Sequence, residues 1–154
     1  DRAIEDYSEA IRLNPDNANS YYLRGASYSC VERHDVAVKD SFETIRLKPD
    51  HDSAYLLRGL AYIENEAYGM AIWNFDIAIN LRTNNATAYQ IRGRAYDEQR
   101  QYDLAKMDYD EAIRLKPNKA GVYADRGFIY LRNGRFGQAI WDFVQAIRLK
   151  LEKE

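Results

Sequence analysis

The sequence predicts an all-α solenoid of stacked antiparallel helix pairs, because one pattern of residues returns every 34 positions. An Arg-Gly dipeptide begins at Arg24, Arg58, Arg92 and Arg126, and each step between these arginines is 34 residues. A tyrosine stands three residues before and three residues after each of these glycines, so the three positions share one helical face. An array of this kind builds an extended surface rather than a reaction centre.

The first element expected along the chain is the second helix of a helix pair, within 1–17. Ala3, Tyr7 and Ala10 stand at the three- and four-residue spacing of a helix face, and Pro15 ends the pattern. The first helix of this pair would precede Asp1, so we expect a half repeat here. We also expect the chain to be a fragment of a longer array, or an array whose ends pack against other copies.

The next elements are the two helices of a full repeat. In repeat 18–51 the first helix is expected over 18–31 and the second over 35–47, since each carries apolar and small residues at helical spacing. The same pattern predicts helix pairs in the repeats 52–85, 86–119 and 120–153. Residues placed to cap the incoming helices are Asn17, Asp50, Asp52, Asn84, Asn85 and Asn118.

The glycine inside each first helix needs a compensating contact, because glycine in a helix interior costs about 1 kcal/mol relative to alanine. Close approach of a neighbouring helix supplies such a contact. We expect these glycines to pack on the alanine column of the second helices. In repeat 18–51, Ser41 replaces the aromatic residue of that helix, and we expect Phe42 to fill part of the gap.

These columns resemble the tetratricopeptide repeat family. Tyrosine, glycine, alanine, Phe or Tyr, and proline fall at the family's spacing in most repeats, over nearly the whole chain. The resemblance implies a single domain over 1–154 with the form of a right-handed superhelix. It also implies a concave groove, lined by the first helices, that holds a protein or peptide segment. Such an array serves as a protein–protein interaction scaffold and is not an enzyme.

By this resemblance, the groove is lined by first-helix residues that follow the first tyrosine, the glycine and then one further turn. These candidate partner-binding residues are Tyr22, Ala26, Ser29, Leu56, Leu60, Ile63, Gln90, Arg94, Asp97, Phe128 and Leu131. The lining is apolar in 52–85 and 120–153 and charged in 86–119, which favours a partner segment with apolar flanks around a polar or charged centre.

Each arginine of the Arg-Gly dipeptides has a partner column on the second helices, either 16 residues after it or 18 residues before it. We predict that Arg24, Arg58, Arg92 and Arg126 pair with Asp6, Asp40, Asp108 and Asp142 on adjacent helices, through charge-assisted hydrogen bonds. Arg92 is expected to be the exception, because Asn74 offers no charge. The alternative is a set of solvated charges that contribute little to stability.

A second interface is predicted on the second helices, where large residues occupy a column that is normally polar. Its members are Trp73, Ile77, Met107 and Trp141. Exposed tryptophan is enriched at interfaces, so a homo-oligomer formed through this surface or through uncovered ends is an alternative function. The other interpretation is that these side chains fold down over neighbouring helices. A regulatory arm of a larger enzyme is a third alternative.

Composition limits the remaining functions. The formal charge of −2 gives no general attraction for nucleic acid, and no apolar run is long enough for a membrane span. We expect no metal and no cofactor, since the acidic residues around His51 are explained by helix capping. The lone Cys30 excludes an internal disulfide framework and favours a reducing compartment such as the cytoplasm.

Overall fold

The computed structural model describes residues 2–152, which form nine α-helices and no strand. In chain order the helices are α1 Arg2–Leu13, α2 Ala18–Cys30, α3 His34–Leu47, α4 Asp52–Glu64, α5 Tyr68–Leu81, α6 Ala86–Glu98, α7 Tyr102–Leu115, α8 Ala120–Arg132 and α9 Phe136–Leu151. The predicted all-α class and the helix pairs of every repeat are confirmed. Asp1 of the half repeat 1–17, residue 153 of the repeat 120–153 and residue 154 lie outside the described residues.

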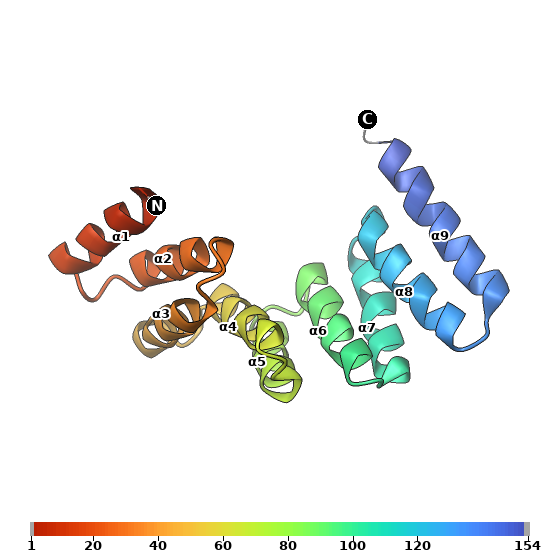
Figure 1. The fold of residues 1–154 in the computed structure, drawn as a ribbon, viewed down its shortest axis with the longest axis horizontal. Helices are drawn as coiled ribbons and strands as arrows, with labels where there is room; N and C mark the ends of the chain where they lie inside the picture. The colour runs from red at the N-terminus through yellow and green to blue at the C-terminus, as the bar shows by residue number, and fades with distance from the viewer. Residues whose placement is uncertain (1, 153–154) are drawn as a thin grey trace. The chain divides into compact units, whose positions relative to one another are not determined.

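The chain divides into two compact units, Asp1–Arg82 and Thr83–Glu154. In the first unit α2 pairs with α3 and α4 with α5, while α1 packs on α2. In the second unit α6 pairs with α7 and α8 with α9. Figure 1 shows each first helix turning back along its second helix through a short connection. A single array over 1–154 stays a prediction.

Helix boundaries agree with the sequence pattern to within one residue in repeat 18–51, but only part of the capping pattern is right. The side chain of Asn17 accepts hydrogen bonds from Asn19 and Ser20, and Asn85 does the same for the start of α6. The other assignments are wrong, because α4 and α8 begin after His51 and Lys119. Asp52 therefore lies inside α4 and pairs with Arg82, at 3.2 Å.

Every turn from a first to a second helix uses a left-handed residue at the same place in the repeat. Glu32, Glu66, Arg100 and Gly134 have φ between 56° and 69°. This conformation ends the first helix and reverses the chain within a few residues. Only one of the four positions carries glycine, so the turn is fixed by the packing of the helix pair more than by local preference.

The glycines of α4, α6 and α8 pack against aromatic rings and not against the alanine column that the sequence suggested, whereas a Cβ atom on Gly25 of α2 would meet Asp40 and Ala37. A Cβ atom on Gly59 would overlap the Phe75 ring. A Cβ atom on Gly93 would lie 2.8 Å from the Tyr109 ring, and one on Gly127 would lie 2.8 Å from the Phe143 ring. The ring occupies the volume that any side chain would need, which offsets the conformational cost of glycine in the helix.

In repeat 18–51 the core of the helix pair contains small polar residues. Ser41 and Thr44 are fully buried, and their hydroxyl groups donate to the carbonyl oxygens of Ala37 and Asp40, each at 2.8 Å. The expectation that Phe42 fills this core was wrong, since Phe42 is 50% exposed. A residue one position late on a helix points about 100° away, so it cannot replace its neighbour.

We expect Gly59→Ala to lower the free energy of unfolding by about 1–3 kcal/mol, because the added methyl group overpacks the contact with Phe75. Gly69→Ala and Gly137→Ala are matched controls, since these helical glycines have nothing within 4 Å of the new methyl group. The controls should leave stability unchanged or raise it slightly. Urea unfolding followed by circular dichroism measures all three, and a Gly59→Ala protein as stable as the controls would contradict the packing argument.

Candidate functional site

The candidate binding residues of the first unit lie on two neighbouring first helices. Tyr22, Ala26 and Ser29 are on α2, the residues Leu56, Leu60 and Ile63 are on α4, and these two helices contact each other. Leu60 is 38% exposed and the other five are partly buried. The structure therefore brings the predicted apolar lining of this unit together on one pair of helices.

Tyr22 is half-covered by an aromatic neighbour. Its ring centroid lies 4.8 Å from that of His51, the residue that precedes α4. Burial lowers the pKa of His51, and its buried Nδ1 atom has no hydrogen-bond partner in the part of the chain that the structure describes. The neutral imidazole thus extends the apolar surface of Tyr22 toward α4.

In the second unit the predicted charged lining takes part in a network between α6 and α8. Asp125 accepts hydrogen bonds from Gln90 Nε2 at 2.8 Å and from Arg94 Nε at 2.9 Å. Lys119 donates to Gln90 Oε1 at 2.9 Å. Further along the helices, Arg132 of α8 pairs with Asp97 of α6. A partner would meet charges already engaged by this chain.

Sequence reasoning missed the three α8-side members of this network, Lys119, Asp125 and Arg132. A usable signal was present, since Arg94 and Asp125 are 31 residues apart and Asp97 and Arg132 are 35 apart, close to one repeat. Opposite charges at that distance in a 34-residue array lie on adjacent first helices. Burial raises the pKa of Asp97 against the opposing effect of Arg132, and burial lowers the pKa of Lys119.

Beside this polar network lies an exposed apolar surface. Phe128 is 52% and Leu131 43% exposed on α8, and the Phe128 ring meets Phe143 edge-on at 5.1 Å. A hollow of about 370 Å³ opens between α8 and α9 next to these rings. Its lining is almost wholly apolar and consists of Ala120, Gly121, Ala124, Phe128, Phe143, Ala146, Ile147 and Lys150.

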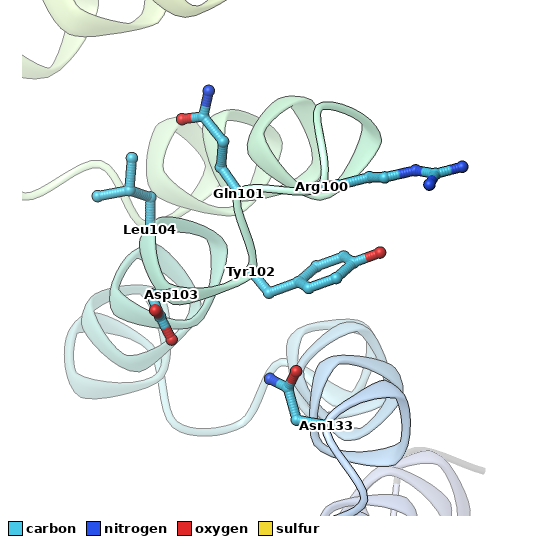
Figure 2. Close-up of a pocket in the computed structure, with 6 residues that line it drawn as sticks. All are labelled: Arg100, Gln101, Tyr102, Asp103, Leu104 and Asn133. Carbon is cyan, nitrogen blue, oxygen red and sulfur yellow. The ribbon is translucent and has the colours of Figure 1, made fainter.

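A second hollow in this unit is polar and small. It has a volume of about 340 Å³ and lies between the start of α7 and Asn133, just after α8. Figure 2 shows Arg100 and Tyr102 extending in the same direction, while Gln101 and Leu104 point away from Asn133. These side chains do not converge on a common point, so the hollow lacks the arrangement of acid, base and nucleophile that catalysis needs.

Three of the predicted arginine–aspartate pairs are present, and the arginine that meets Asn74 is Arg58. Arg24 binds Asp40 through two hydrogen bonds of 2.9 and 2.7 Å, and Arg92 binds Asp108 at 2.8 and 2.6 Å. Arg126 binds Asp142 at 2.9 and 2.7 Å. In every case the partner is the residue 16 positions later, on the second helix of the same repeat.

Two assignments in this set were wrong. Asn74 bonds to Arg58, at 2.7 Å, and not to Arg92. Asp6 is exposed, and the third hydrogen bond of Arg24 goes to the Ser8 hydroxyl at 3.3 Å. The reason is geometric: an arginine reaches the second helix of its own repeat directly, and it meets the preceding second helix two residues later than the spacing suggested.

The second predicted surface is exposed over about half of each tryptophan, while the rings also lie against Arg58 of α4 and Tyr123 of α8. Trp73 is 53% exposed, Met107 65% and Trp141 54%, whereas Ile77 is partly buried. On α9 the apolar exposure continues along the helix. Its members are Phe136, Ile140, Val144, Ile147 and Leu151. Whether this surface is an interface stays a prediction.

Metal and membrane sites have no support in residues 2–152. No group of three or more His, Cys, Asp or Glu side chains in this range could hold a metal ion. None of the described helices is long and apolar enough to cross a membrane. Cys30 is a free, exposed cysteine.

The stacked helix pairs and their extended exposed surfaces define a helical-repeat protein with the fold of an interaction scaffold. A family model described as TPR repeat matches residues 1–29, and one described as Tetratricopeptide repeat matches residues 86–119. The chain is a tetratricopeptide repeat protein, as the sequence columns predicted.

Solved structures share this fold. A crystal structure of MamA matches with a TM-score of 0.89 and 25% identity, over 97% of this chain and 88% of that chain. A MamA structure from Desulfovibrio magneticus RS-1 matches at 0.88 and 20% identity, over 98% and 85% of the two chains. YrrB, a TPR protein with an unusual peptide-binding site, matches at 0.78 and 20% identity, over 96% and 76%. No curated protein sequence matches the chain.

The arginine pairs generate a stability prediction. Arg126 is held by two carboxylates, Asp142 and Asp110; burial opposes its charge, but these hydrogen bonds outweigh burial and raise its pKa. We expect Asp142→Ala to lower the free energy of unfolding by about 3 kcal/mol, because it leaves a buried guanidinium with one carboxylate. Glu111→Ala removes the exposed pair with Arg114 and should leave the stability nearly unchanged. Equal urea midpoints for the two variants would refute the structural role of the buried pair.

Proposed function

We propose that the chain is a non-catalytic scaffold that binds a protein or peptide segment along the first helices of each unit. The observation that carries the proposal is the exposure of apolar residues where a folded chain normally buries them. Leu60 on α4 and both Phe128 and Leu131 on α8 present apolar surface to solvent. A partner that covers such surface gains about 25 cal/mol for each Å² removed from water.

The two units offer a partner different chemistry. In the first unit Leu56, Leu60 and Ile63 form an apolar strip beside the stacked Tyr22 and His51. This strip suits apolar side chains at helical or extended spacing. The peptide-binding site named for YrrB, which shares 20% identity with this chain, is consistent with such a use of the fold.

In the second unit the polar network sets a further requirement. Arg94 is 53% exposed in its pair with Asp125, so its outer N–H groups can donate to an additional acceptor of a partner. Phe128 and Leu131 supply apolar contacts on the same helix as Asp125. We therefore favour a segment in which a backbone carbonyl or carboxylate is followed by apolar side chains.

A second candidate function is self-association through α9, favoured by the row of exposed apolar residues along that helix. Ile140 is 63% exposed and Val144 53%, one helical turn apart. Contiguous apolar surface of this kind marks interaction sites in soluble proteins. A second copy of the chain would supply an apolar helix face of its own.

The groove proposal predicts which variants lose a selected peptide. Peptides of random sequence displayed on phage would be selected on the wild-type protein and their affinities measured by calorimetry. We expect Leu60→Arg or Phe128→Ala to weaken the selected peptides by roughly tenfold or more, as for loss of a central apolar contact. Leu104→Arg is the matched control, because Leu104 is 42% exposed on a second helix. Peptides bound equally by Leu60→Arg, Phe128→Ala and the wild type would exclude the groove.

The self-association proposal predicts a concentration-dependent mass. Sedimentation of the wild type should show a dimer or larger species, and an Ile140→Glu, Val144→Glu double variant should be a monomer at the same concentrations. The two glutamates interrupt the exposed apolar row, and both residues that they replace are exposed. A wild type that sediments as a monomer throughout would end this proposal.

A further inference from the structure

Arg58 differs from the other three arginines of the Arg-Gly dipeptides in having no carboxylate bonded to it. Arg58 donates a hydrogen bond to the neutral amide oxygen of Asn74, whereas Arg24, Arg92 and Arg126 each bind an aspartate at the equivalent position. Arg58 is also the most buried of the four, with 4% of its surface exposed. A buried charge is normally paired, because removing it from water is costly.

Arg24 and Arg126 also bond to a residue of the preceding second helix, and at Arg58 that residue is replaced as well. The residue 16 positions before the arginine is Ser8 for Arg24 and Asp110 for Arg126, and both accept a hydrogen bond. For Arg58 that residue is Phe42, whose ring centroid lies 4.4 Å from the guanidinium carbon. Tyr55 and Trp73 complete the surroundings at 5.4 and 5.8 Å.

Three rings stabilise the cation without neutralising it. Each cation–π contact is weaker than the penalty for burying an ion, so the rings offset only part of that penalty. Burial lowers the pKa of Arg58, but a guanidinium keeps its proton in proteins. A positive charge therefore remains beneath this surface of the first unit.

Two of the three rings form an exposed surface above that charge. Phe42 on α3 is 50% exposed and Trp73 on α5 is 53% exposed, although both contact the guanidinium. The surface is separate from the groove residues. On α4, Arg58 stands two residues from Leu56 and two from Leu60, which places it on the opposite side of the helix.

We propose that this surface binds an acidic segment of a partner protein. A carboxylate of that segment neutralises Arg58 at the edge of the Phe42 and Trp73 rings, and a neighbouring apolar side chain packs on their exposed faces. The chemistry follows from charge complementarity: the missing anion of the pair is supplied by the partner, in place of the aspartate found in the other repeats. An aromatic surface over a single cation suits a short acidic and apolar segment better than a polyanion, and the net charge of −2 does not attract polyanions.

The test uses Asn74→Asp, which restores the carboxylate present at Asp40, Asp108 and Asp142. We expect this variant to unfold at a higher temperature than the wild type and to bind acidic segments less tightly, because its own carboxylate takes the place of the partner's. Asn80→Asp is the matched control. It adds the same charge at an exposed position of the same helix and should change neither property.

The probe is the acetylated, amidated peptide GEFELEG, compared with its glutamine counterpart GQFQLQG. Binding is followed by the fluorescence of Trp73 in a Trp141→Phe background, which leaves one tryptophan in the chain. We expect the glutamate peptide to bind and the glutamine peptide to bind roughly tenfold more weakly or worse. Asn74→Asp and Phe42→Ala should each weaken the glutamate peptide by a similar factor, and Leu104→Gln, at an exposed position of the second unit, should leave it unchanged.

Several results would overturn the proposal. Equal binding of the two peptides removes the need for a carboxylate, and equal binding by Asn74→Asp and the wild type removes Arg58 as its partner. Inorganic phosphate that displaces the glutamate peptide at equal concentration indicates a general anion site. Loss of a wild-type dimer in Phe42→Ala indicates that a second copy of this chain occupies the surface.

Discussion

Each helix pair of the described chain depends on close contact between the first helix and the second. Where the second helix carries an aromatic ring, as at Phe75 and Tyr109, a bare glycine backbone receives it. The glycine lets the two helices approach, and the ring fills the space between them. The arginine that precedes each glycine then reaches the residue 16 positions later on the second helix. Apolar packing and a polar bond thus fasten the same two helices from neighbouring positions.

This division of roles leaves other faces of the first helices exposed, where we propose that a partner binds. Leu60 and Phe128 are exposed because the glycine and arginine positions of their helices already make the contacts that hold the pair. In the second unit, Asp125 ties α6 to α8 through Gln90 and Arg94. The surface next to Phe128 is therefore presented on helices whose separation is fixed, which reduces the entropy lost when a partner binds.

The repeat also makes its own exceptions visible. Because Asp40, Asp108 and Asp142 show what the arginine column normally binds, Asn74 stands out as a missing charge. Ser41 stands out in the same way, since its hydroxyl bonds to the backbone where other repeats place a ring. The hydroxyl group of Ser41 has its hydrogen-bond partner within the chain. Asn74, in contrast, leaves the Arg58 cation beneath exposed aromatic rings.

The sequence alone determined the helices, their pairing and the family, because a 34-residue period with fixed tyrosine, glycine and alanine columns admits few other folds. It also determined that the arginines meet an acidic column. The tertiary structure decided which arginine meets Asn74, which ring covers which glycine, and that Asp125 binds the charged residues of α6. These outcomes depend on the register and rotation of one helix against another. Side-chain spacing within a helix does not specify that rotation; the packing of whole helices does.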